Sequence, residues 1–228
     1  MKLPDFFDEI PRLCMHDPLA ETLGCAEGGL LEYGYADAVR LTGHSCPTVA
    51  AAYWLTWRAL AELYPGAIPE RGRIKVEFRD DVRTGSNGVV ANVVQMLTGA
   101  GGSTGFKGIG GRYARVGLLR FAPGLPLSLR FTRLDDGTSI DAAAALDLPT
   151  ADPEMAPLLA RCAKGSLDSF SMRRLGVLWQ ARVRHLLLDL AYDPAVFVIR
   201  RVESQRDACL AAIESRRGER RARETHAQ

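Results

Sequence analysis

The residue types best suited to chemistry lie together in residues 43–47 (Gly-His-Ser-Cys-Pro), directly before a long apolar segment. Pro47 suits the first position of a helix, because its fixed φ is helical and no amide hydrogen is needed there. Cys46 is then the helix N-cap, where the helix dipole and free backbone amides favour a thiolate. A thiolate is both a nucleophile and a metal ligand, and His44 lies two residues earlier. The spacing therefore predicts a functional pair, whereas a lone cysteine would more often be apolar filler.

A tightly held metal needs at least three protein ligands, so His44 and Cys46 require further donors. The first candidate is His16, which is equally compatible with an exposed loop or capping role. The other candidates are Asp17, Cys14, Asp80 and Asp81. Consecutive aspartates at the end of a strand are more typical of a turn. A site with only three protein ligands would leave one position open to water, substrate or a larger cofactor.

A second candidate site is the segment 99–112, in which half of the positions are glycine. Successive backbone amides in such a loop can form a nest for phosphate or carboxylate, assisted here by Lys107 and Arg112. The candidate anion-binding or substrate-binding residues are Gly102, Gly105, Lys107 and Gly108. The segment is neither a Walker A motif nor a dinucleotide fingerprint, because it follows a helix and lacks both spacings. The alternative is a tight connection that needs positive φ angles.

Composition limits the class of protein that carries these residues. The chain has 228 residues, 47% of them hydrophobic, and 29 Lys and Arg against 27 Asp and Glu. These proportions exclude disordered, collagen-like and coiled-coil chains, and the small net charge predicts no nucleic-acid partner. The five cysteines form no Cys-x-x-Cys motif, which favours a reducing compartment over a disulfide framework. With no signal peptide and no membrane-length apolar stretch, we expect a cytoplasmic protein without a membrane partner.

Hydrophobic periodicity predicts the elements that position both sites. Residues 48–64 should form a central buried helix, and residues 73–79 alternate as a half-buried strand does. A second helix is expected around residues 89–97, capped at Ser86 or Asn87 and ended by Gly99. Three strands at 113–121, 127–133 and 139–145 should follow, joined by tight turns. The resulting order predicts an α+β fold.

The rest of the chain is expected to flank this core. Residues 1–40 look like an irregular lead-in, with a short helix from Asp17 to Gly24 and a strand at 30–35. We expect a core domain over residues 1–148 and a helical extension over 149–215 that packs on it. The extension should contain helices near 154–164 and 169–190, then a strand at 195–199 that could rejoin a sheet. Residues 216–228 are predicted to be a disordered, charged tail that is dispensable for folding.

Two sequence blocks resemble a known family. The Gly-His-Ser-Cys-Pro segment, followed by an Ala-rich helix with Tyr53, resembles the His-x-Cys-Pro signature of the FmdE family of formylmethanofuran dehydrogenase subunits. Residues 92–99, with Gly-Phe-Lys-Gly at 105–108, resemble that family's second block, a helix ending in Gln-x-Leu-Thr-Gly and then a Gly-Lys loop. The likeness covers roughly residues 37–146 and keeps both blocks in order.

This resemblance implies an α+β core with a mixed sheet, grouped with a glyceraldehyde-phosphate-dehydrogenase-like domain. It also implies a homodimer and a bound transition metal, usually zinc, at the His-x-Cys motif. The chain departs from the family in several ways. Thr48 replaces a glycine, Ala100 replaces a common cysteine, and the C-terminal zinc finger of some members is absent. The chain therefore resembles a divergent member of the family.

Three functions are compatible with these residues. The leading one is a homodimeric protein that binds zinc or another transition metal, either an accessory protein or a small metalloenzyme; the resemblance implies a link to one-carbon or redox metabolism. The second is a metal-independent thiol enzyme, with Cys46 as nucleophile and His44 as base, acting on a small anionic substrate. The third is a metal or haem carrier, since Tyr53, Trp54 and Trp57 could wall a planar cofactor. The apolar girth of the 48–64 helix also favours a dimer.

Overall fold

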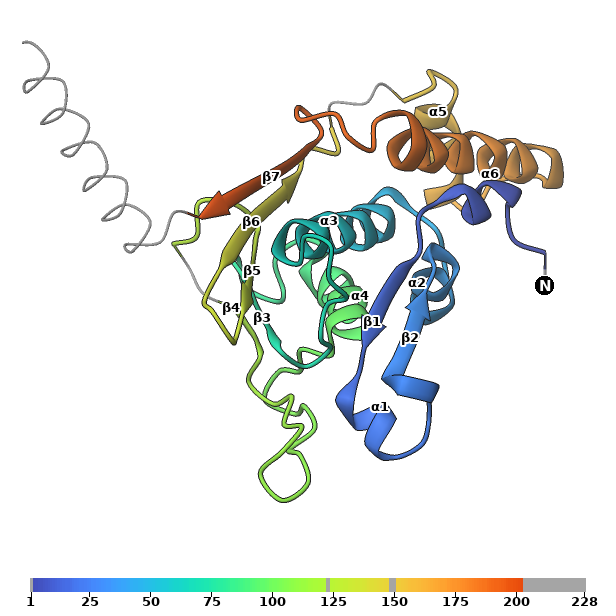
Figure 1. The fold of residues 1–228 in the computed structure, drawn as a ribbon. Coiled ribbons are helices and arrows are strands. Elements are labelled where there is room, and N and C mark those ends of the chain that lie inside the picture. The colour runs from blue at the N-terminus through green and yellow to red at the C-terminus, as the bar shows by residue number, and fades with distance from the viewer. Residues whose placement is uncertain (1, 122–123, 148–150, 203–228) are drawn as a thin grey trace, which may run out of the picture.

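The fold joins helices to a mixed β-sheet, so the α+β class predicted from the sequence is confirmed. The computed structural model describes residues 2–121, 124–147 and 151–202 (Figure 1). The helices are α1 (Pro18–Thr22), α2 (Tyr35–Thr42), α3 (Pro47–Leu63), α4 (Asn87–Thr98), α5 (Met155–Ala163) and α6 (Ser169–Arg184). Shorter helical turns lie at Asp5–Glu9, Glu27–Gly29 and His185–Asp189, the last of them a π-helical turn. The strands are β1 (Leu13–His16), β2 (Leu30–Tyr33), β3 (Ile74–Phe78), β4 (Leu119–Phe121), β5 (Leu129–Arg133), β6 (Ser139–Ala144) and β7 (Phe197–Val202).

Five strands form the main sheet in the order β4-β3-β5-β6-β7. β4 runs parallel to β3, and the other neighbouring pairs are antiparallel. In β3 the apolar residues Ile74, Val76 and Phe78 are buried and the residues between them are less so, as the two-residue period predicts. β7 pairs with β6, so the C-terminal segment completes the same sheet that begins in the core. β1 and β2 form a separate antiparallel pair.

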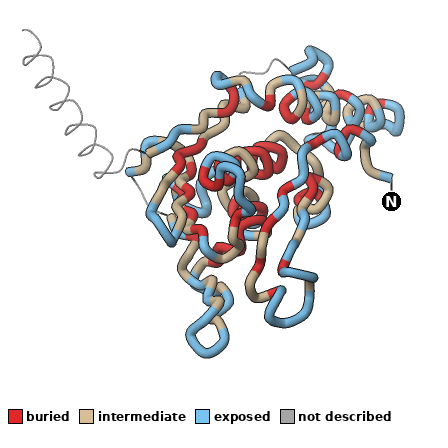
Figure 2. The backbone as a smooth tube through the Cα atoms, viewed as in Figure 1, coloured by how far each residue is buried: buried red, intermediate tan, exposed pale blue. Residues whose placement is uncertain are grey.

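α3 lies across the main sheet and is covered on most sides within one chain (Figures 1 and 2). It contacts β5, β6 and β7 on one side and α2, α4, α6 and the π-helical turn on others. Most of its residues from Val49 to Leu63 are buried as a result. The apolar surface of α3, from which the sequence analysis predicts a dimer, is thus already buried within one chain. The homodimer stays a prediction without that support.

The structure differs from the elements predicted from the sequence in two places. Residues 1–40 are more regular than an irregular lead-in, because they contain β1 and most of α2, two short elements with little periodicity of their own. The strand expected over residues 113–121 is limited to β4, because the backbone before it bonds to the glycine-rich segment: the amide of Gly101 donates to the carbonyl of Arg115. β4 also pairs with β3, so it forms no hairpin with β5.

The predicted tail over residues 216–228, with the prediction that it is dispensable, lies outside the described residues. So does the end of the proposed helical extension beyond residue 202. Within the described ranges, every helix is too short or too polar to span a bilayer.

Candidate functional site

The structure places His44 and Cys46 in the short loop between α2 and α3. Gly43 ends α2 in the left-handed conformation (φ 78°), and Cys46 is the extended N-cap of α3 with Pro47 after it, as predicted. His44 is exposed, and its Nδ1 lies 3.0 Å from the carbonyl oxygen of Thr42. A carbonyl oxygen can only accept, so Nδ1 carries the hydrogen and the lone pair of Nε2 is left for another partner. Cys46 is half-buried, and its side chain makes no capping hydrogen bond.

Ser45, between these two residues, is clamped from distant parts of the chain. Its hydroxyl lies 2.9 Å from the hydroxyl of Tyr35 and donates to Oε1 of Gln180 at 2.9 Å. Its carbonyl accepts from Nε1 of Trp179 at 2.9 Å and from Nε2 of Gln180 at 3.3 Å. Burial raises the pKa of Tyr35, so its hydroxyl stays neutral. No local feature of the sequence indicates that Trp179 and Ser45 are partners.

We expect Trp179→Phe to loosen this loop. Phenylalanine keeps an aromatic ring but lacks the indole N–H that donates to the carbonyl of Ser45. The free energy of unfolding should fall by about 1 kcal/mol, the usual worth of one such bond. Urea unfolding measures it, with Val177→Ala on the exposed side of the same helix as the control. A loss no larger than the control's would mean that the clamp contributes nothing.

His16, the first candidate for a third ligand, is engaged elsewhere. It ends β1, and its Nε2 lies 3.0 Å from a carboxylate oxygen of Glu21. Two of the other candidates have local partners, since Asp80 pairs with Arg79 and the Asp81 carboxylate accepts from the amide of Arg83. Cys14 is exposed on β1. In the part of the chain that the structure describes, no group of three or more His, Cys, Asp and Glu side chains is arranged to hold a metal ion.

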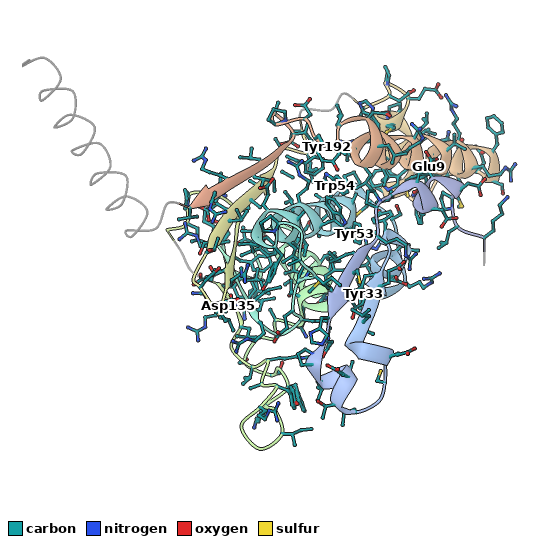
Figure 3. All side chains as sticks on the ribbon, viewed as in Figure 1. Glu9, Tyr33, Tyr53, Trp54, Asp135 and Tyr192 are labelled. Atoms are coloured by element: carbon teal, nitrogen blue, oxygen red, sulfur yellow. The ribbon has the colours of Figure 1, made fainter. Side chains whose placement is uncertain are left out.

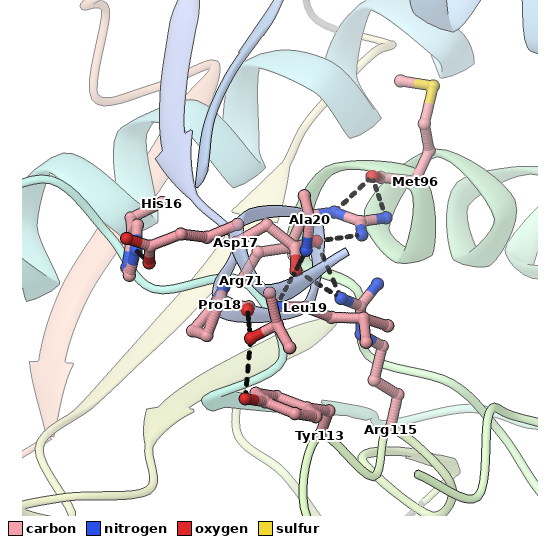
Figure 4. Close-up of polar contacts among 11 residues, drawn as sticks. His16, Asp17, Pro18, Leu19, Ala20, Arg71, Met96, Tyr113 and Arg115 are labelled. Carbon is pink, nitrogen blue, oxygen red and sulfur yellow. Dashed lines mark hydrogen bonds and ion pairs between the residues drawn. The ribbon is translucent and has the colours of Figure 1, made fainter. Parts of the chain in front are cut away.

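Asp17, another candidate ligand, is the centre of a buried ion cluster (Figure 4). It caps α1, accepting from the amides of Leu19 and Ala20 as the sequence predicts for a cap before Pro18. Nη1 of Arg71 donates to it at 2.9 Å, and Nη2 of Arg115 donates to both of its oxygens at 2.6 and 2.7 Å. Every carboxylate oxygen is therefore taken by a protein donor.

Two opposing effects act on the pKa of Asp17. Burial raises the pKa, but the hydrogen bond from Arg71, the backbone bond from Ala20 and the charge of Arg115 together lower it below its ordinary value. The carboxylate is thus held in its charged form. The sequence analysis identified neither arginine as a candidate functional residue.

The glycines of the segment 99–112 allow two stretches of backbone to approach closely. A Cβ on Gly101 would lie 2.7 Å from the Cα of Gly105, and one on Gly108 (φ 91°) would overlap the carbonyl oxygen of Arg112. The amide of Gly105 donates to the carbonyl of Gly102, and the amide of Gly117 donates to the same carbonyl. These contacts explain the glycine content by loop closure. The tip of this loop projects from the body of the molecule (Figure 1).

The aromatic residues of α3 pack within the chain (Figure 3). The hydroxyl of Tyr53 donates to the carbonyls of Pro11 and Tyr33, and Nε1 of Trp57 donates to the carbonyl of Arg12. Trp54 is fully buried and stacks on Trp57 with ring centroids 5.0 Å apart. Each ring thus has a structural partner, which accounts for the three aromatics without a planar cofactor.

Comparison with known proteins adds a distant likeness. No family model and no curated protein matches this sequence. Among solved structures, the chain is similar to a tungsten formylmethanofuran dehydrogenase (FmdE)-like protein from Syntrophus aciditrophicus. The identity is 16%, the match covers 76% of this chain and 74% of that one, and the TM-score is 0.37. A likeness this distant transfers no ligand and no residue role to this chain.

Proposed function

We propose that this chain binds a transition metal ion, zinc or one of similar preference, through Nε2 of His44 and the sulfur of Cys46. The supporting observation is the hydrogen bond from Nδ1 of His44 to the carbonyl of Thr42. Histidines that bind metals commonly donate their other ring N–H to a backbone carbonyl, which fixes the tautomer and the ring orientation. An imidazole nitrogen and a thiolate are ligands that zinc accepts readily.

The donor set fits an open site better than a closed one. A structural zinc site has four protein ligands, whereas the described residues offer no group of three around any point. An ion held by two protein donors keeps positions for water, a small ligand or a partner. This favours an accessory protein or metal carrier over a structural zinc protein. The homodimer, the cytoplasmic location and the binding of haem stay predictions.

Metal content of the untagged, natively purified protein tests this proposal. We expect the parent to carry metal and Cys46→Ser to lose most of it, because a serine hydroxyl stays protonated near neutral pH and is a poorer ligand than a thiolate. Serine keeps a capping oxygen at the N-cap, so α3 should survive. His44→Ala should lose metal to a similar extent. Mass spectrometry of the metal per chain gives the result.

Two variants serve as matched controls. Cys162→Ser changes an exposed thiol on α5, and His16→Ala removes an imidazole that faces Glu21; neither should lower the metal content. A loss in His16→Ala as large as in His44→Ala would show that His16 is a ligand after all. A metal-free parent, or equal metal in Cys46→Ser, would reject the metal site. If the parent is metal-free, loss of an enzymatic activity on alkylation of Cys46 alone would support the thiol-enzyme alternative.

A further inference from the structure

A cavity of about 520 Å³ adjoins the Asp17 cluster, whose residues form part of its lining. It is bounded by the start of α1, by the turn before β3 at residues 70–73, and by residues 111–115, where the glycine-rich segment ends. Its charged lining consists of Arg71, Arg73, Arg112, Arg115, Asp17 and Glu70. Four guanidinium groups against two carboxylates leave an excess of two positive charges in one concave space. The volume lies within the range of pockets that hold small molecules.

The arginines differ in how far the protein already uses them. Arg71 donates through Nη1 to Asp17 and through Nε and Nη2 to the carbonyl of Met96, so each of its three nitrogens is already engaged within the protein. Within the described ranges, the side-chain hydrogen bonds of Arg115 all leave from Nη2. Arg115 is 14% exposed, and Asp17 fixes its position. Its remaining N–H groups are thus held in place at the cavity with capacity to donate.

The other two arginines are exposed and free to adjust. Arg73 pairs with Glu70 at a long 3.7 Å. Arg112 lies over the ring of Tyr113, 5.0 Å from its centroid. Neither contact consumes the donor fork of the guanidinium, which suits the two oxygens of a carboxylate or phosphate. A fixed Arg115 and two adjustable arginines therefore converge on the same space.

One residue that lines the cavity, Tyr113, has a strained backbone conformation. Tyr113 is the one non-glycine residue with positive φ (60°) among the described residues, and its hydroxyl lies 2.8 Å from the hydroxyl of Thr22 (Figure 4). A non-glycine residue in this region costs about 1–2 kcal/mol, and such strain is most common at functional sites. The apolar part of the lining includes Pro18, Leu19 and Leu134. The cavity thus offers cationic donors beside a small apolar surface.

We propose that this cavity binds the oxyanion group, carboxylate or phosphate, of a small organic molecule. Arg115 is the fixed donor, Arg73 and Arg112 close on the anion, and the apolar lining takes the body of the ligand. Asp17 is a positioning residue, because it orients Arg115 while both of its oxygens accept from protein donors. The lining of the cavity includes neither His44 nor Cys46, so this proposal is tested independently of the metal proposal.

Calorimetric titration with inorganic phosphate and with succinate tests this, at low ionic strength because salt screens such contacts. Sodium chloride at matched ionic strength gives the background. We expect one of the two probes to bind saturably, and the probe that binds identifies the oxyanion class. Arg112→Gln and Arg73→Gln should each weaken that binding about tenfold through loss of charged donors. Both side chains are exposed, so the fold should persist, which circular dichroism checks.

Arg83→Gln is the matched control, because Arg83 is exposed and carries the same charge as Arg112 but does not line the cavity. Its affinity should stay within about twofold of the parent's. No saturable binding of either probe by the parent would overturn the proposal. So would an equal loss of affinity in Arg83→Gln and Arg112→Gln, which would indicate general electrostatic attraction rather than binding in the cavity.

Discussion

Replacing Asp17 with asparagine is expected to lower the free energy of unfolding by about 3–5 kcal/mol, because it removes the anion at the centre of a buried ion cluster. The Asp17 side chain is 3% exposed, and both arginines that it pairs with are 14% exposed. Two guanidinium groups would then face each other without the counter-charge between them and with little water. The amide can still accept one bond, so capping of α1 should be the lesser part of the loss. Urea unfolding at neutral pH measures the change.

The pH dependence provides an independent check of the same cluster. The folded-state pKa of Asp17 lies below its ordinary value of 3.8, so its contribution to stability is fully present above about pH 4. That contribution is lost as the pH falls through the lowered folded-state pKa. The difference in stability between the parent and Asp17→Asn should therefore shrink on acidification. Asp80→Asn, which breaks an exposed pair with Arg79, should cost less than about 1 kcal/mol and serves as the control. Equal losses in the two variants would contradict the assignment.

Trp54→Ala is expected to cost about 3–5 kcal/mol of unfolding free energy, through a cavity in the core and the loss of a buried hydrogen bond. The indole is 1% exposed, stacks on Trp57 and meets the ring of Tyr192 edge-on. Its Nε1 donates to the carbonyl of Ala191, which joins α3 to the segment after α6. Trp54→Phe should fall between the parent and the alanine variant, because it keeps part of the packing.

Phe170→Ala is the control for this truncation, since Phe170 is an aromatic residue that is 74% exposed on α6. Its removal should change stability by less than about 0.5 kcal/mol. Thermal and urea unfolding of the three variants and the parent give the comparison. A small loss in Trp54→Ala would show that the contact between α3 and the C-terminal segment is not needed to hold the core together.

Features governed by a few neighbouring residues follow from the sequence alone. Pro47 after Cys46 and Pro18 after Asp17 predict two helix starts, because proline favours the first helical position and leaves the preceding residue as the cap. The alternation in β3 and the apolar run of α3 predict a half-buried strand and a buried helix. Glycine at the ends of α2 and α4, with φ of 78° and 73°, marks two helix stops. Each of these depends on local sterics and backbone hydrogen bonding.

Other features depend on contacts between residues that are far apart in the chain. Asp17 meets Arg71 and Arg115, which are 54 and 98 residues away, and Trp179 reaches Ser45 across 134 residues. No local pattern encodes such partners, because any of the chain's many arginines could neutralise one carboxylate. The parallel pairing of β4 with β3 is of the same kind, since only the path of the glycine-rich loop brings it there. The sequence therefore determined where the helix carrying Cys46 starts, whereas packing alone decided which arginines gather around a cavity.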